Sequence, residues 1–130
     1  MAFACTVLTP EQQILDEQVT QVIFPAHDGQ VGILTDRAPM MTKLGIGELR
    51  LDLSSGQKRA FFIDGGIAQM KENRLTVLTN EAIAKDQIDV AAARAEFDEA
   101  TASHPIDPRQ LELRQHRLAR ARTLQSMGAK

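Results

Sequence analysis

The residues best suited to acid–base chemistry form two short polar groups in the first third of the chain. His27 and Asp28 precede Gly29, and Asp36 and Arg37 follow a few residues later. A histidine beside a carboxylate can serve as a general base. Histidine, aspartate and glycine are also common in turns between strands. We interpret both groups as turns, because no nucleophile, base and acid occur together as a set.

Metal, thiol and phosphate chemistry are also poorly supported by the sequence. The three histidines fall in separate segments: His27, His104 and His116. Cys5 is the single cysteine, has no adjacent basic residue to activate it, and is typical of a reducing compartment. Gly65-Gly66 would cradle a phosphate only if a helix followed directly, but Ile67–Met70 favours a strand. We therefore expect no catalytic residue, no metal site and no cofactor.

Composition excludes several other classes of protein. The chain has 130 residues, of which 43% are hydrophobic and 25% charged, as in globular domains with a core. A net charge of −2 and the absence of Trp and Tyr argue against nucleic-acid binding. The sequence contains no long apolar run that predicts a membrane span, and its start does not resemble a secretory signal.

The elements that would position any site change in type near residue 86. Residues 1–86 hold seven of the eight glycines and show strand-like alternation, as in Leu49, Leu51 and Leu53. A hairpin turn is predicted at 54–57, and another turn at 72–74. This pattern predicts an antiparallel β-sandwich of about ten strands, so the fold class is α+β.

Residues 87–130 predict a second domain, an antiparallel hairpin of two helices. Asp86 or Asp89 can cap the first helix, and Asp107 followed by Pro108 can begin the second. Each helix carries one apolar stripe. The stripes comprise Val90, Ala93, Phe97 and Ala100 in the first helix, and Leu111, Leu118, Ala121 and Leu124 in the second.

The two predicted helices carry opposite charge. Residues 87–107 contain one arginine and five carboxylates, a net of −4, whereas residues 108–130 have six basic residues and one glutamate, a net of +5. The helices can therefore pair with each other, or the second helix can leave and bind an acidic partner. The sequence leaves both alternatives open.

Several strings, taken in order, resemble the epsilon subunit of F-type ATP synthases, whose mitochondrial counterpart is called delta. They are Val7–Glu11, Gly29–Leu34, Ala38–Thr42, Gly47–Arg50, Ile63–Ala68, Val77-Leu78 and Ile88-Asp89. The likeness covers the first 90 residues, and the remainder matches only as a helical hairpin. The resemblance implies a flattened sandwich followed by two helices, and a subunit without catalytic activity.

The resemblance also implies function and partners. It implies a rotor subunit of a proton- or sodium-translocating enzyme that links gamma to the c-ring and inhibits ATP hydrolysis through its helices, which contact the alpha and beta subunits. The implied location is the cytoplasmic face of a bacterial inner membrane, with which the protein associates only as part of the complex. The stromal face of a thylakoid is the alternative. The implied gamma and c-ring contacts are Gly29, Gln30, Val31, Gly32, Ile33, Met40 and Met41. We expect the regulatory arginines to be Arg114, Arg117, Arg120 and Arg122.

The sequence departs from the family pattern at three places. Gln30 replaces a common glutamate, and Thr35 and Arg37 replace the usual proline and histidine of the loop. Some bacterial members bind ATP through an I-D-x-x-R-A motif, of which Ile88 and Asp89 are present while the arginine is absent. Nucleotide binding is therefore not expected. A ligand-binding sandwich module and a small enzyme are the competing classes, although the first lacks surface aromatics and the second lacks a site.

Overall fold

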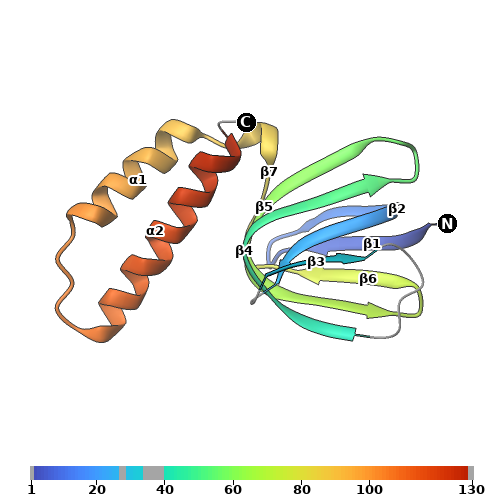
Figure 1. Cartoon of the computed structure of the whole chain (residues 1–130), viewed down its shortest axis with the longest axis horizontal. Coiled ribbons are helices and arrows are strands. Elements are labelled where there is room, and N and C mark those ends of the chain that lie inside the picture. The colour runs from blue at the N-terminus through green and yellow to red at the C-terminus, as the bar shows by residue number, and fades with distance from the viewer. Residues whose placement is uncertain (1, 27–28, 34–39, 129–130) are drawn as a thin grey trace. The chain divides into compact units, whose positions relative to one another are not determined.

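The protein is described here from a computed structural model that covers residues 2–26, 29–33 and 40–128, without the side chains of 29–33. The chain divides into two compact units, residues 1–84 and 85–130. The first unit is a sheet structure, and the second contains the helices (Figure 1).

The first unit contains seven strands in its described residues, three of them 14 residues long. The expected count of about ten is not confirmed. The strands are β1 (Phe3–Leu8), β2 (Gln13–Ala26), β3 (Gly29–Ile33), β4 (Met40–Leu53), β5 (Lys58–Lys71), β6 (Arg74–Leu78) and β7 (Ala82–Ala84). Strands β2 and β5 pair with different neighbours along their two halves, so counting short alternating segments overestimates the number of strands.

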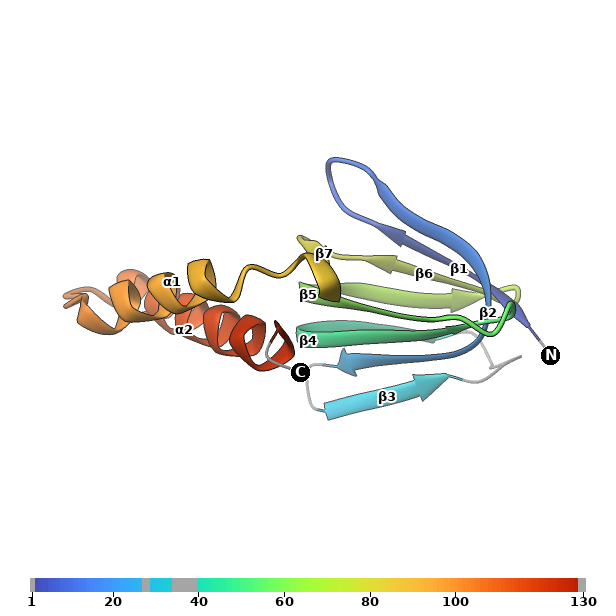
Figure 2. The ribbon, with the colours of Figure 1, turned by 90° about the horizontal axis from the view of Figure 1, so that it is seen from above.

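The sheet closes on itself. Its order is β1-β6-β5-β4-β2, with β1 and β2 also paired, while β3 adds to β2 and β7 adds to β5 (Figure 2). Among the described strands, all pairings are antiparallel except β1 with β6, which is parallel and corrects the fully antiparallel prediction. Strands so distant in sequence are joined by no hairpin, so tertiary packing sets their direction.

Glycines allow the long strands to bend. In the pairing of β4 with β5, Leu44 faces Gly66 and Ile46 faces Asp64, so the register continues unchanged past Gly45 and Gly65, which lie between these two pairs. Gly65 and Gly66 have φ values of 72° and 115°, a region that disfavours side chains. The Thr79 hydroxyl donates to the Gly65 carbonyl at 2.7 Å. The predicted strand at Ile67–Met70 is confirmed, although the two glycines lie within the single strand β5 and do not separate two strands.

The core of the first unit follows the predicted alternation. Leu49, Leu51 and Leu53 are buried, whereas Arg50 between them is exposed. The predicted turns are also present, and Glu72 and Asn73 adopt positive φ between β5 and β6. The largest fully buried side chains are Phe3, Phe24, Phe62, Leu49, Leu51, Ile63, Met70 and Leu75.

The second unit begins with a short 3-10 turn, η1 (Lys85–Gln87), followed by α1 (Val90–Ala102) and α2 (Pro108–Gly128). Asp89 caps α1 by accepting from the Ala92 amide at 3.0 Å. Asp107 does the same for α2, accepting from the Gln110 amide at 2.8 Å. These caps confirm the predicted helix starts, because an aspartate before the first turn satisfies an otherwise free amide.

Fewer side chains are buried between the helices than the predicted apolar stripes contain. Buried residues are limited to Ala93 and Ala100 in α1 and to Ala121, Leu124 and Met127 in α2. Leu111 was expected on the apolar side but is 44% exposed. It precedes Arg114, which contacts the last turn of the shorter helix α1, so Leu111 lies toward the end of α2 that α1 does not cover.

Candidate functional site

The first candidate surface contains the residues expected to contact gamma and the c-ring. Gly29, Gln30, Val31, Gly32 and Ile33 form β3, which pairs with β2; their side chains lie outside the description. His27, Asp28 and residues 34–39, including Thr35, Asp36 and Arg37, also lie outside it.

The two methionines at the start of β4 differ in exposure. Met40 is half-buried and packs against the core, whereas Met41 is 65% exposed. Successive strand residues point to opposite faces, which accounts for the difference. Of the two, Met41 is therefore the one available for an interface.

Sequence reasoning missed an apolar row beside Met41. Ile67 of β5 and Leu78 of β6 are directly opposite in the sheet and are 41% and 49% exposed. The register also pairs Met41 with Gln69, two residues from Ile67 on the same face. Ile67 could have been detected from its alternation with buried Ala68 and Met70, which places it outward with the polar Gln69. We call Met41, Ile67 and Leu78 the outer apolar patch.

Polar residues continue this face toward the β5–β6 turn. A shallow hollow of about 320 Å³ is lined by Gln69, Lys71, Glu72, Arg74 and Thr76. The Arg74 guanidinium donates to the Thr6 hydroxyl at 2.9 Å and lies 3.6 Å from the Asp16 carboxylate. This cluster ties β6 to β1 and β2, so its role is explained by the fold.

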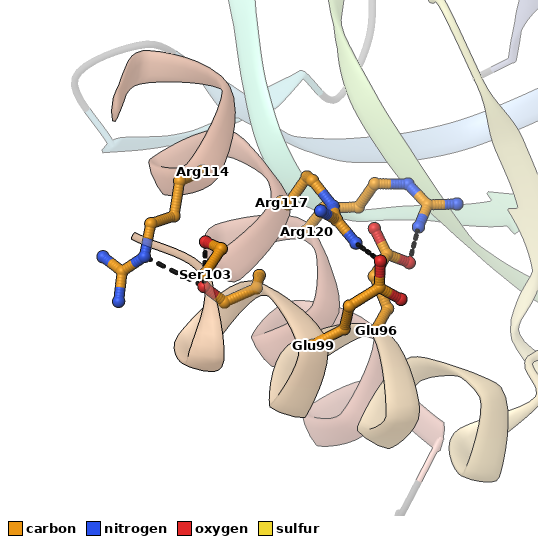
Figure 3. A network of polar contacts seen from close by, with 7 residues as sticks. Glu96, Glu99, Ser103, Arg114, Arg117 and Arg120 are labelled. Atoms are coloured by element: carbon orange, nitrogen blue, oxygen red, sulfur yellow. Dashed lines mark hydrogen bonds and ion pairs between the residues drawn. The ribbon is translucent and has the colours of Figure 1, made fainter. Parts of the chain in front are cut away.

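The second candidate surface is the arginine side of α2, where all four expected arginines contact α1. Figure 3 shows three of them, Arg114, Arg117 and Arg120. Arg120 meets Glu96 at 2.7 Å, and Arg117 meets Glu99 at 3.4 Å. The Arg122 guanidinium lies 5.9 Å from the centre of the Phe97 ring, a distance suited to a cation–π contact. The structure thus shows the alternative in which the oppositely charged helices pair with each other.

Arg114 makes a different kind of contact. Its Nε donates to the Ala100 carbonyl at 2.9 Å and its Nη2 to the Thr101 carbonyl at 3.3 Å. These contacts reach the backbone of α1 at its last turn. The sequence identifies Arg114 only by its charge, because a bond to a backbone carbonyl on another helix leaves no pattern in sequence.

The incomplete nucleotide motif lies at the start of α1. Asp89 uses its carboxylate as the helix cap, and Ile88 is half-buried. Ala92 occupies the position of the motif arginine, and Arg94 is exposed two residues later. Two residues correspond to about 200° around a helix, so Arg94 points away from that position.

The remaining reactive side chains form no site in the described part of the chain. Among those residues, no group of three or more His, Cys, Asp and Glu is arranged to hold a metal ion. Burial, with a smaller contribution from the Asp16 charge, raises the pKa of the Cys5 thiol from 9.0 to about 12. The thiol is therefore protonated at neutral pH and is a poor nucleophile. Neither described helix has a stretch long and apolar enough to cross a bilayer.

Comparison with known proteins gives a consistent family match. Residues 2–85 match the model for the ATP synthase Delta/Epsilon chain, beta-sandwich domain. An ATP synthase epsilon chain from Rhodopirellula baltica is 38% identical over 122 residues, covering 94% of both chains. Another, from a Synechococcus strain, is 36% identical and covers all of this chain and 98% of its own.

Solved structures share the fold. A chain in the Euglena gracilis mitochondrial ATP synthase structure, described as OSCP/F1/c-ring, superposes with a TM-score of 0.86 at 23% identity, covering 96% of this chain and 80% of its own. A chain in the Tetrahymena thermophila central stalk and c-ring structure has a TM-score of 0.71 at 15% identity, covering 96% and 95%. At these identities the likeness concerns the fold.

Proposed function

Because the chain belongs to the ATP synthase delta/epsilon family, we propose that it is a non-catalytic rotor subunit, which links gamma to the c-ring in the central stalk. In this role it associates with the cytoplasmic face of a bacterial inner membrane through the complex. The transported ion is a proton or sodium. The family match carries this proposal, since it covers both units of the chain in the Synechococcus relative.

The outer apolar patch supports docking of the first unit onto a stalk partner. Met41, Ile67 and Leu78 expose 65%, 41% and 49% of their surface on three adjacent strands. Clustered exposed apolar side chains are typical of protein interfaces. Methionine also adapts to irregular partner surfaces. We assign this patch, together with β3, to contacts with gamma and the c-ring.

Assembly tests this assignment. Ile67→Asp places a charge in the patch without entering the core, and Val31→Asp places a charge in β3. We expect either variant to prevent purification of the chain with gamma and the c-ring from membranes. Gln57→Asp, in the exposed β4–β5 turn, makes an equivalent charge change and should assemble normally. Normal assembly of both interface variants would refute the assignment.

The helical hairpin is proposed to restrain ATP hydrolysis. Its two helices bury few apolar side chains, so helix α2 can exchange α1 for another partner at modest cost. Exposed pairs such as Arg117–Glu99 are worth roughly 0–1 kcal/mol. A partly desolvated acidic cleft between the alpha and beta subunits would bind the same arginines more strongly.

Enzyme assays on the assembled complex test the regulatory role. Deletion from Pro108 onward should raise ATP hydrolysis while synthesis and coupling survive. Alanine at all four of the arginines that contact α1 should have the same effect. Alanine at Arg94 and Arg109, which lie outside this set, provides the matched control. Unchanged hydrolysis in both the deletion and the fourfold variant would refute regulation by α2 and leave the stalk role intact.

A further inference from the structure

The last turn of α1 is completed by a residue of the other helix. The final carbonyls of a helix have no partner within it and must find one elsewhere. The Ala100 carbonyl accepts from the Ser103 hydroxyl at 2.7 Å and from Arg114 Nε at 2.9 Å, and the Thr101 carbonyl accepts from Arg114 Nη2 (Figure 3). One guanidinium on α2 thus bridges two successive carbonyls of α1.

We propose that Arg114 is the clasp of the hairpin, a positioning residue that couples separation of α2 to loss of the last turn of α1. When α2 leaves, the Arg114 donors leave with it. Ser103 alone then caps α1, and its hydroxyl reaches only the Ala100 carbonyl. Opening therefore removes an interhelical contact and weakens α1 at the same time, which makes closure cooperative.

The ion pairs of Arg117 and Arg120 do not have this property. Arg117 and Arg120 pair with the side chains of Glu99 and Glu96. When such a pair separates, both partners return to water and the backbone bonds of α1 are unchanged. The Arg117 and Glu99 side chains are already 38% and 76% exposed, so their pairing contributes little. Arg114, by contrast, donates two hydrogen bonds to the α1 backbone.

The Arg114 clasp matters because few apolar side chains are buried between the two helices. Helix α1 buries the side chains of two alanines, and α2 buries those of one alanine, one leucine and one methionine. The N-terminal part of α2 exposes Leu111 and Leu113 by 44% and 59%, so burial holds this end less firmly than the other. Arg114 lies just beyond these leucines, where a polar contact can decide whether the helices stay together.

This inference deepens the regulatory half of the proposed function, but its test uses the isolated full-length chain. Nitroxide labels on cysteines replacing exposed Ala95 and Gln115 report the distance between the helices by pulsed electron resonance. Hydrogen exchange reports the last turn of α1. Native Cys5 is buried and protonated at neutral pH, so it does not compete for the label.

Arg114→Gln and Arg114→Lys should both broaden the distance distribution and raise amide exchange in the last turn of α1. Loss of one charged hydrogen bond corresponds to roughly a tenfold increase in exchange. Lysine is included because it keeps the charge but lacks the planar pair of donors that bridges two carbonyls. Ser103→Ala should raise exchange without broadening the distance, and Arg109→Lys should change neither.

Three results would overturn the clasp. The first is an unchanged distance distribution in both Arg114 variants, which would make Arg114 a cap alone. The second is equal broadening in Ser103→Ala, since that variant keeps the bridge. The third is opening in Arg114→Gln with closed behaviour in Arg114→Lys, which would mean that charge suffices. None of these results concerns hydrolysis in the complex, so the proposed regulation would be judged separately by the deletion.

Discussion

Replacing Gly66 by alanine should destabilise the strand unit much more than the same change at Gly56. Both glycines have positive φ, 115° and 98°, so alanine at either site costs roughly 1–2 kcal/mol of backbone strain. A Cβ at Gly56 would meet nothing within 4 Å. A Cβ at Gly66 would collide with the Leu78 carbonyl oxygen and lie 2.7 Å from the Thr79 Cα.

The collision at Gly66 involves backbone atoms, which cannot rotate away. Relief requires β5 and β6 to separate where Ile67 pairs with Leu78. Forcing extra volume into a packed site typically adds about 1–3 kcal/mol. We therefore expect a total cost of roughly 2–5 kcal/mol for Gly66→Ala against roughly 1–2 kcal/mol for Gly56→Ala.

Urea unfolding measures this difference, with a probe confined to the strand unit. Cys5 is fully buried, so brief pulses of a thiol reagent label only unfolded strand units. The midpoint should fall in both variants, and further for Gly66→Ala. Equal destabilisation of the two variants, within about 0.5 kcal/mol, would refute the argument that the β5 backbone approaches β6 too closely for any side chain. The same change should also disturb the outer apolar patch, because Ile67 follows Gly66 directly.

Three further predictions concern single groups. Because the pKa of the Cys5 thiol is raised to about 12, the folded protein holds this proton at pH values where the unfolded chain loses it. The free energy of unfolding, measured with urea, should therefore fall as pH rises above 9. The fall should be shallower in Cys5→Ala. Asp107→Ala removes the cap of α2 and should lower hairpin stability by about 0.5–2 kcal/mol, measured by thermal loss of helical circular dichroism, whereas Asp107→Asn should cost less. Calorimetric titration with ATP should show weak binding or none, because the missing motif arginine removes a contact worth roughly 1.5–3 kcal/mol; low-micromolar affinity would contradict this reasoning.

Local chemistry made several features predictable from sequence alone. Asp89 and Asp107 begin helices because a short carboxylate satisfies the nearest free amides, whatever else surrounds it. The alternation of Leu49, Leu51 and Leu53 defines a buried face because strand side chains point alternately to two sides. These signals extend over a few residues, so they survive in a single sequence. The order of the family-like strings placed the chain in its family, which the comparisons confirm.

Tertiary structure decided the features that depend on distant partners. The parallel pairing of β1 with β6 joins segments about 70 residues apart, which no local pattern specifies. Leu111 has the spacing of a buried residue but is exposed, because the apolar stripe of α2 buries side chains only at its C-terminal half. Arg114 differs from the other arginines by its bonds to Ala100 and Thr101, although all four look equivalent as charges in the sequence. Residue types and spacing thus determined the elements, whereas contacts between elements determined which side chains remained available for function.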